Sequence, residues 1–182
     1  MTPGVVSRCT DAELPELVEL VNAAYRGQGS QPGWTSEVGL VDGQRVTQQA
    51  LRGEIAAAPD LRIYLLRAPP ELLACVRIED GRGLNGEPAC YISMLAVRPG
   101  LQDAGLGRQM LEFAEDEGRA RGARIARMTV VSIRASLIAW YERRGYRRTG
   151  ETEPFPYDDE RFGRPQQGGL EFVVLQRDLL SG

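Results

Sequence analysis

Residues 89–107 of the chain read ACYISMLAVRPGLQDAGLG. The apolar run Ala89–Val97 predicts a buried strand, and apolar residues at helical spacing from Leu106 onward predict a helix. The glycines around residue 105 predict a tight turn between the two. Free N–H groups and the positive end of the helix dipole converge at such a turn, and glycine lets a ligand approach the backbone, so the stretch is a candidate phosphate site. A short glycine turn is a weak signal without support from the rest of the chain.

The length and composition of the chain are those of one globular domain. Its 182 residues suit a single domain over 1–182, and a hydrophobic fraction of 42% is ordinary for a protein with a buried core. No apolar run approaches the roughly 18 residues that a membrane span needs. The first residues lack the apolar stretch of a signal peptide. We therefore expect a cytoplasmic protein that does not enter a membrane.

Two missing residue types narrow the chemistry. The chain contains no histidine, and all 22 of its basic residues are arginine. These absences exclude a Ser-His-Asp triad, a histidine base, most catalytic zinc sites, a lysine Schiff base and a Walker-type phosphate loop. The arginine bias is typical of a GC-rich bacterial genome. A net charge of −3 makes the whole chain no electrostatic match for nucleic acid. Carboxylates, tyrosines and thiols remain as acid–base groups.

The three cysteines do not have the spacing of a metal site. Cys9, Cys75 and Cys90 are odd in number and scattered, so we expect buried, reduced thiols and no metal. Cys75 and Cys90 fall on strands that we expect to be neighbours, a position in which their side chains could lie close together. A disulfide between them is not expected in a cytosolic protein.

Periodicity and turn residues divide the chain into strands and helices. Thr10 and Glu13 have the spacing of a capping box, and Ser132 has the position of an N-cap for the last helix. We expect strands at 5–8, 62–67, 72–79, 89–97, 125–131, 146–149 and 170–176, and helices at 11–25, 46–57, 106–121 and 134–144. Residues 26–43, 79–88 and 150–169 are polar or rich in glycine and proline and are expected to be loops.

The last predicted helix carries a second pattern. Residues 133–146 read IRASLIAWYERRGY. On a helix, Arg134 and Tyr141 lie about two turns apart on one face, which they share with Leu137 and Ile138. Two interpretations stay open at this point. Tyr141 belongs to a ligand site, or it packs its ring in an amphipathic helix and exposes its hydroxyl.

Together the two patterns indicate a family. A strand, a QxxGxG turn, an amphipathic helix, a further strand and a helix ending in WYERRGY follow in an order and spacing that resemble the GNAT superfamily of N-acetyltransferases. Residues 62–150 match the core of that family. The resemblance implies an α/β fold, with a mixed and mostly antiparallel sheet of six to seven strands flanked by helices on both faces. It also implies that acetyl-CoA enters where two neighbouring strands separate.

The resemblance also implies roles for individual residues. Leu95, Ala96 and Val97 would offer backbone hydrogen bonds to the pantetheine arm and the carbonyl of acetyl-CoA. Tyr141 would protonate the departing CoA thiolate. The residues expected around the pyrophosphate are those of the turn and its flank, Gln102, Asp103, Ala104, Gly105, Leu106, Gly107 and Arg108.

The chain departs from the family pattern at several positions. Asp103 and Ala104 stand where the family usually has a glycine and a basic residue. Arg134 stands where an asparagine often contacts the cofactor, and its guanidinium can reach a phosphate instead. The central strand has Ser93 and Met94 in the region where some members have a carboxylate base.

We therefore expect the proton acceptor and the pocket for the amine substrate in other parts of the chain. Glu79, at the end of its strand, is the candidate base, with Glu37, Glu151, Glu153 or a water chain as alternatives. Trp34 and Glu37 in the loop 26–43, with Tyr25, are expected to wall the substrate pocket. One or two of the arginines at 119–127 and 143–148 are expected to hold the 3′-phosphate of CoA.

We expect transfer of an acetyl group from acetyl-CoA to a primary amine, on a small molecule or a peptide, by direct attack and without a metal. A homodimer is left open. The alternative is a catalytically weak GNAT-fold module that binds acyl-CoA or a protein partner.

Overall fold

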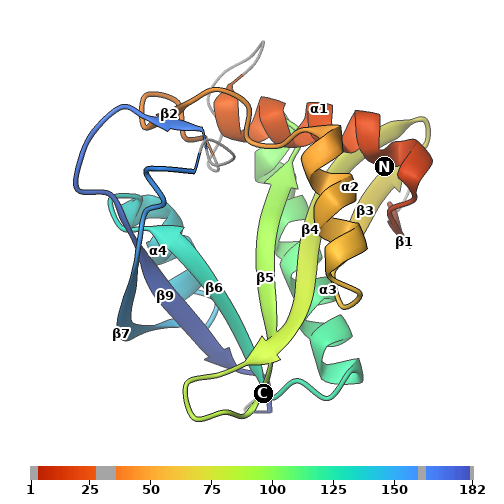
Figure 1. The fold of residues 1–182 in the computed structure, drawn as a ribbon. Coiled ribbons are helices and arrows are strands. Elements are labelled where there is room, and N and C mark those ends of the chain that lie inside the picture. The colour runs from red at the N-terminus through yellow and green to blue at the C-terminus, as the bar shows by residue number, and fades with distance from the viewer. Residues whose placement is uncertain (1–3, 28–35, 160–162, 181–182) are drawn as a thin grey trace.

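The computed structural model describes residues 4–27, 36–159 and 163–180. Figure 1 shows a central sheet with helices against it, and two short strands form a separate sheet. The strands are β1 (Val5–Arg8), β2 (Val41–Asp42), β3 (Arg62–Ala68), β4 (Glu71–Arg82), β5 (Pro88–Val97), β6 (Ile125–Val131), β7 (Arg147–Pro154), β8 (Arg164–Pro165) and β9 (Glu171–Asp178). The helices are α1 (Leu14–Arg26), α2 (Gln48–Ala57), α3 (Leu106–Ala120) and α4 (Ala135–Glu142), with short 3-10 turns η1 (Asp11–Glu13) and η2 (Gln102–Ala104).

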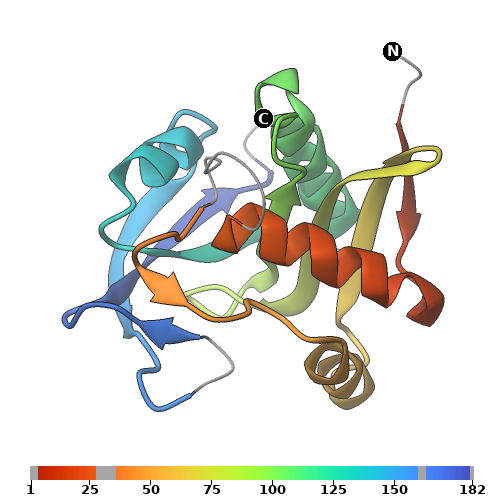
Figure 2. The same cartoon turned by 90° about the horizontal axis from the view of Figure 1, so that it is seen from above.

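The central sheet has seven strands in the order β1-β3-β4-β5-β6-β9-β7. All neighbouring strands are antiparallel except β5 and β6. Helices α1 and α2 cover one face, and α3 and α4 cover the other (Figures 1 and 2). Each face has its own cluster of buried apolar side chains, one including Leu17 and Leu51 and the other including Met110 and Ile138. The expected fold class is therefore confirmed.

Local signals in the sequence account for the helix ends. The backbone N–H of Thr10 and its hydroxyl both donate to the Glu13 carboxylate, at 2.9 and 2.8 Å, which completes the expected capping box. Thr47 accepts from the N–H of Ala50 at the start of α2. Gly122 ends α3 with a φ of +88°, a conformation that glycine adopts without strain. Within the described residues, no helix has both the length and the apolar character to cross a bilayer.

Strands β5 and β6 are paired over a short distance only. Their parallel register runs from Ala89 with Ile125 to Tyr91 with Arg127, three pairs in all. Beyond Tyr91 the strands diverge, and Figure 1 shows them meeting at the bottom of the view and separating toward α1 at the top. The sheet therefore contains a wedge, defined by the diverging parts of β5 and β6, where the resemblance places acetyl-CoA.

One strand beside the wedge contains a β-bulge. Cys75 pairs with Ala96 and Arg77 pairs with Ser93, so the two residues between on β5 oppose the single Val76 on β4. The first of them, Met94, has a φ of +49°, which is unusual for a residue other than glycine. A bulge disrupts the hydrogen-bond ladder and redirects the backbone, and bulges often lie beside active sites. The bulge therefore changes the backbone direction on the β5 side of the wedge.

Several predicted boundaries are wrong because long-range pairing extends the strands. β4 continues three residues past Glu79, since Asp80 is held by Arg62 at 2.7 Å and by Arg121 at 2.7 Å. The predicted loop at 79–88 is therefore a hairpin with a short turn. β7 continues to Pro154, past the predicted end at residue 149, because β9 provides a long partner. β2 and β8 form a small sheet between two predicted loops.

Two further expectations are corrected. Ser132 does not cap α4, because its N–H is still bonded to the carbonyl of Glu171 and the helix starts after Arg134. Cys75 and Cys90 are not close together. Their strands are neighbours, but Cys90 pairs with Asp80, five residues from Cys75, and the two thiols belong to the clusters on opposite faces. All three cysteines are free, with Cys75 and Cys90 buried and Cys9 half-buried.

Gly118→Ala and Gly53→Ala should change stability in opposite directions. A Cβ at Gly118 in α3 would lie 2.5 Å from the sulfur of the buried Cys90, whereas a Cβ at Gly53 in α2 meets no described atom within 4 Å. Overpacking costs about 1–3 kcal/mol, more than the up to about 1 kcal/mol that alanine contributes in a helix interior. Thermal and urea unfolding should show Gly118→Ala destabilised and Gly53→Ala stabilised.

The double variant Gly118→Ala/Cys90→Ala provides the control for this packing. It removes the sulfur and should lose less stability than the sum of its single changes. If Gly118→Ala is as stable as Gly53→Ala, α3 does not pack on β5 as closely as described.

Candidate active site

The wedge between β5 and β6 contains a cavity of about 310 Å³. Side chains from α1, both diverging strands and α4 line it, which brings together segments that are far apart in the sequence. They include Tyr25, Leu95, Thr129, Arg134, Leu137 and Tyr141. Such a site has an apolar wall with a few polar groups, as small-molecule sites commonly do. We call it the wedge cavity.

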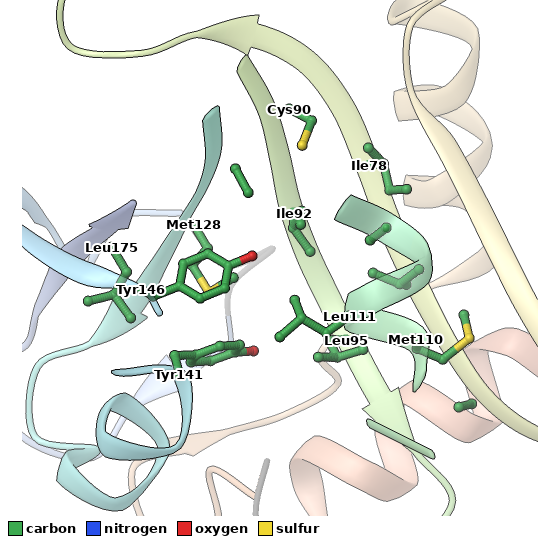
Figure 3. Close-up of a cluster of buried hydrophobic side chains, with 14 of the residues drawn as sticks. Ile78, Cys90, Ile92, Leu95, Met110, Leu111, Met128, Tyr141, Tyr146 and Leu175 are labelled. Carbon is green, nitrogen blue, oxygen red and sulfur yellow. The ribbon is translucent and has the colours of Figure 1, made fainter. Parts of the chain in front are cut away.

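Tyr141 contributes a buried phenol to the wedge cavity. Its residue is 6% exposed, and its ring makes edge contacts with Trp140 and Tyr146 at centroid distances of 5.0 and 5.7 Å. Figure 3 shows its hydroxyl pointing from α4 toward Leu95 on β5. Burial raises the pKa of Tyr141, the neighbouring Tyr25 adds to the increase, and Arg134 opposes it. The phenol therefore stays protonated at neutral pH and can donate a hydrogen bond.

A second tyrosine approaches the bulge from the other side of the wedge. The hydroxyl of Tyr25, at the end of α1, donates to the carbonyl of Leu95 at 3.3 Å. Burial raises its pKa as well. The guanidinium carbon of Arg45 lies 5.5 Å from the centroid of the Tyr25 ring. Arg45, which follows the predicted loop 26–43, thus lies beside the ring whose hydroxyl contacts the bulge of β5.

The narrow end of the wedge is fixed by a side-chain hydrogen bond. Tyr91 is in the last parallel pair of β5 and β6, and its hydroxyl lies 2.6 Å from the hydroxyl of Thr129. Burial raises the pKa of Tyr91, so its hydroxyl remains protonated and hydrogen-bonded. Sequence reasoning missed this pair, because the two residues are separated by 38 positions and neither belongs to a motif.

A larger cavity of about 660 Å³ adjoins the wedge cavity on the face covered by α1 and α2. The two cavities share four lining residues, namely Arg45, Tyr91, Ser93 and Met94. We call the larger one the side cavity. It is built by residues 44–54 together with β4 and β5. The shared lining means that two ligands, one in each cavity, would meet at the bulge of β5.

The candidate base Glu79 lines the side cavity and not the wedge cavity. Its carboxylate accepts a hydrogen bond from Arg77 Nε at 2.8 Å, and the same guanidinium contacts Glu54 through Nη1. Of the alternative carboxylates, Glu37 and Glu153 line the wedge cavity, and Arg26 holds Glu37 at 2.5 Å with 14% of its side chain exposed. Trp34 lies outside the described residues.

The glycine turn has the expected backbone form. Gly105 has a φ of +77°, follows η2 and directly precedes α3, and a Cβ built on it meets no described atom within 4 Å. Leu106 and Gly107 are buried in the first turn of α3, Gln102 is half-buried and Ala104 is exposed. The first N–H groups of a helix lack partners within it, so this end of α3 offers donors to an anion. The structure describes the backbone of Asp103 but not its side chain.

The remaining predicted cofactor residues divide into two groups. Leu95 and Arg134 line the wedge cavity. Ala96 and Val97 are fully buried and paired with Cys75 and Ala74 on β4, so their side chains are part of the core. Among the described residues, no cluster of three or more carboxylate or thiol side chains is arranged to hold a metal ion.

A basic groove lies near the turn. Arg108 is 66% exposed and bonded to Glu112 at 2.7 Å. Together with Arg143 and Arg144 it lines a groove of about 580 Å³. The guanidinium carbon of Arg144 lies 3.5 Å from the centroid of the Trp140 ring. Two of the predicted arginines therefore lie beside the N-terminal end of α3. By contrast, Arg121, Arg127 and Arg148 are in ion pairs with Asp80, Glu151 and Glu142.

Comparison with known proteins agrees with this fold. The model of the acetyltransferase (GNAT) family matches residues 34–146. An uncharacterized N-acetyltransferase in the pepI 3′ region of Lactobacillus delbrueckii subsp. lactis is 23% identical over 154 residues, 83% of this chain and 88% of that one. An IAA acetyltransferase of Azospirillum brasilense is 30% identical over 103 residues, 56% of this chain and 65% of that one.

Solved structures share the fold. An N-acetyltransferase from Staphylococcus aureus Mu50 superposes with a TM-score of 0.70 at 14% identity, over 98% of this chain and 99% of that one. The Salmonella typhimurium protein YncA, whose structure contains its cofactor acetyl-CoA, superposes with a TM-score of 0.67 at 18% identity, over 98% and 95%. The chain belongs to the GNAT family of acetyltransferases.

Tyr91→Phe should destabilise the protein through the narrow end of the wedge. It leaves the Thr129 hydroxyl without its 2.6 Å partner, and a lost buried hydrogen bond typically lowers the free energy of unfolding by about 0.5–1.5 kcal/mol. Urea unfolding of Tyr91→Phe, Thr129→Val and the double variant measures the coupling. The double variant should be closer to wild type than the two losses added together, and strict additivity would show that the hydrogen bond contributes nothing.

Proposed function

We propose that the chain transfers the acetyl group of acetyl-CoA to a primary amine by direct attack, with both substrates bound at once. The arrangement that carries this proposal is the wedge cavity itself, with the bulge of β5 on one wall and the phenol of Tyr141 on the other. Acetyl-CoA supplies an activated thioester carbonyl and a thiol leaving group. Membership in the acetyltransferase family supports the same reaction class.

Three features of the described residues support binding of acetyl-CoA at this site. Past Tyr91 the β6-facing edge of β5 has no strand paired to it within the described register, so the amides of a pantetheine arm can hydrogen-bond there as an added strand does. The N–H groups at the start of α3 suit the pyrophosphate, and the open space over Gly105 lets it approach the backbone. Arg143 and Arg144 in the nearby groove suit the 3′-phosphate.

The bulge supplies donors for the developing oxyanion. The bulge interrupts the ladder at Met94 and Leu95, and both residues line the wedge cavity, so we assign the oxyanion donors to their backbone N–H groups. Fixed N–H donors in a cavity sheltered from water stabilise negative charge without reorganising. The hydrogen bond from Tyr25 to the Leu95 carbonyl holds this part of the bulge in place.

The protons of the reaction can be accounted for with residues of this site. The C–N bond forms, the C–S bond breaks, the amine loses one proton and the leaving sulfur gains one. We assign the proton donor to Tyr141, whose phenol remains protonated because burial raises its pKa. The thiolate of CoA, whose thiol has a pKa of about 8.5, is too weak a base to deprotonate a phenol with a raised pKa, so the proton is transferred while the C–S bond breaks and not afterwards.

Glu79 remains our candidate for accepting the proton of the amine. It pairs across the strands with Tyr91, whereas the bulge opposes Val76, three residues along β4. At about 3.3 Å per residue this separation is about 10 Å, so water must relay the proton. The side cavity, which Glu79 lines, has room for the amine and for this water.

Gly105→Val should weaken acetyl-CoA binding at least tenfold, about 1.4 kcal/mol. A β-branched side chain is strained at a φ of +77° and would occupy the open space over the turn. Gly122→Val is the matched control, because it has the same strain at the far end of α3, roughly 1–2 kcal/mol. Calorimetric titration with acetyl-CoA should show normal affinity for Gly122→Val only. Equal affinity of both variants would disprove the assignment of the turn.

Tyr141→Phe should lower kcat by about 100-fold, at the lower end of the range for general acid catalysis, and leave the Kd of acetyl-CoA nearly unchanged. The change removes one hydroxyl from a ring that remains packed between Trp140 and Tyr146. Thiol release measures kcat. Tyr64→Phe removes a similar hydroxyl, bonded to Glu117 outside both cavities, and should leave kcat unchanged. Unchanged turnover in Tyr141→Phe would show that another group is the acid.

A further inference from the structure

The side cavity carries charges of both signs in separate places. Its lining includes two arginines and two glutamates. Arg77 contacts both glutamates, Glu54 and Glu79, so these three groups form one cluster with a net charge of −1. The guanidinium of Arg45 is placed elsewhere, over the ring of Tyr25. The Arg77 cluster lines only the side cavity, whereas Arg45 lines both cavities, at their junction.

A buried amide holds the backbone of Arg45 in position. Asn22 on α1 is 3% exposed. Its side-chain oxygen accepts from the N–H of Arg45 at 2.6 Å and from the N–H of Val46 at 3.3 Å, and its NH₂ group donates to the carbonyl of Val46 at 3.0 Å. Burying a side-chain amide costs free energy unless its oxygen and its NH₂ group have hydrogen-bond partners, and both groups of Asn22 have them. The backbone of Arg45 is therefore fixed, and the Tyr25 ring packs against its guanidinium, which together lower the entropy lost when the side chain binds a ligand.

Arg45 is also close to the reacting centre. The Tyr25 ring lies under its guanidinium, and the hydroxyl of the same ring donates to the carbonyl of Leu95 in the bulge. One aromatic side chain thus separates the cation from the place where the amine must attack. The span from the guanidinium to the bulge is that of one tyrosine side chain, which suits an acceptor whose anionic group lies near its amine.

We propose that the acceptor is an α-amino acid, whose carboxylate is bound by Arg45 while its amine attacks the thioester beside the bulge. The inference rests on the acetyl transfer proposed above. The guanidinium presents parallel N–H donors that match the two carboxylate oxygens. The net negative Arg77 cluster favours entry of the ammonium form, and the side cavity receives the side chain. A peptide N-terminus has an uncharged amide in place of this carboxylate and fits less well.

The substrate test compares acids with matched amides. Thiol release from acetyl-CoA is measured with the twenty standard amino acids, their carboxamides, the corresponding decarboxylated amines and a set of peptides. A carboxamide makes the neighbouring amine less basic, so the amide has more of the reactive neutral form at a given pH. A preference for the acid therefore reports recognition. For the best amino acid we expect kcat/KM about 100-fold above that of its amide and its decarboxylated amine.

Arg45→Gln tests whether this residue provides the discrimination. The variant should lose about 100-fold in kcat/KM for the amino acid and less than about fivefold for the amide, so that the preference for the acid nearly disappears. The Kd of acetyl-CoA should not change. Arg52→Gln is the matched control, because Arg52 lies on α2, bonded to Asp11 at 2.8 Å, and lines neither cavity. It should retain the full preference.

The outcomes separate this inference from the proposed function. Thiol release that is as fast with amides, simple amines or peptides as with amino acids would overturn the inference and leave acetyl transfer standing. Equal losses for acid and amide in Arg45→Gln would overturn the role of Arg45. Absence of thiol release with every amine in the set would overturn the proposed acetyl transfer itself, and the inference with it.

Discussion

The separation of β5 from β6 after three residue pairs is the constraint on which the rest of the structure depends. A continuous sheet has no space between neighbouring strands, so a ligand can lie within the sheet only where the ladder is interrupted. The interruption removes hydrogen bonds that hold the two halves together, and other contacts must replace them. The hydrogen bond between the hydroxyls of Tyr91 and Thr129 joins the two halves at the narrow end of the wedge. One apolar cluster also holds the two halves together, because it contains buried side chains from both of them. These side chains come from β4, β5, α3, β6, α4 and β9.

A buried polar network reinforces the same junction. Glu115 on α3 is nearly fully buried and accepts hydrogen bonds from Tyr146, before β7, at 2.9 Å and from Arg177 on β9 at 2.8 Å. Burial raises the pKa of Glu115, and the two donors oppose that increase. The network ties the helix behind β5 to the strands beyond β6. It therefore keeps the two halves of the sheet in a fixed relation while the wedge between them stays open, with Tyr141 packed against Tyr146 on one wall.

Much of the fold could be predicted because its signals are local. The capping box at Thr10, the helical spacing after Leu106 and the left-handed glycines at 105 and 122 each involve a few consecutive residues. The errors come from residues whose structure depends on distant partners. Asp80 continues a strand because Arg62 and Arg121 hold it, although its sequence neighbourhood is typical of a loop. The wedge that the family resemblance predicts is present. The hydrogen bond between Tyr91 and Thr129 at its narrow end could not be predicted, because no local sequence pattern indicates it.

The candidate site divides in the same way. Residue types and spacing point to Tyr141, to the glycine turn and to the lack of histidine and lysine chemistry, because these are properties of the chain read in order. The bulge at Met94, the pairing of Glu79 with Arg77 and the placement of Arg45 by Asn22 arise only when α1, β4 and β5 pack together. The physical reason is the distance along the chain over which each kind of interaction acts. Backbone preferences act over a few residues, whereas ion pairs, buried amides and strand separation depend on segments that meet only in the folded protein.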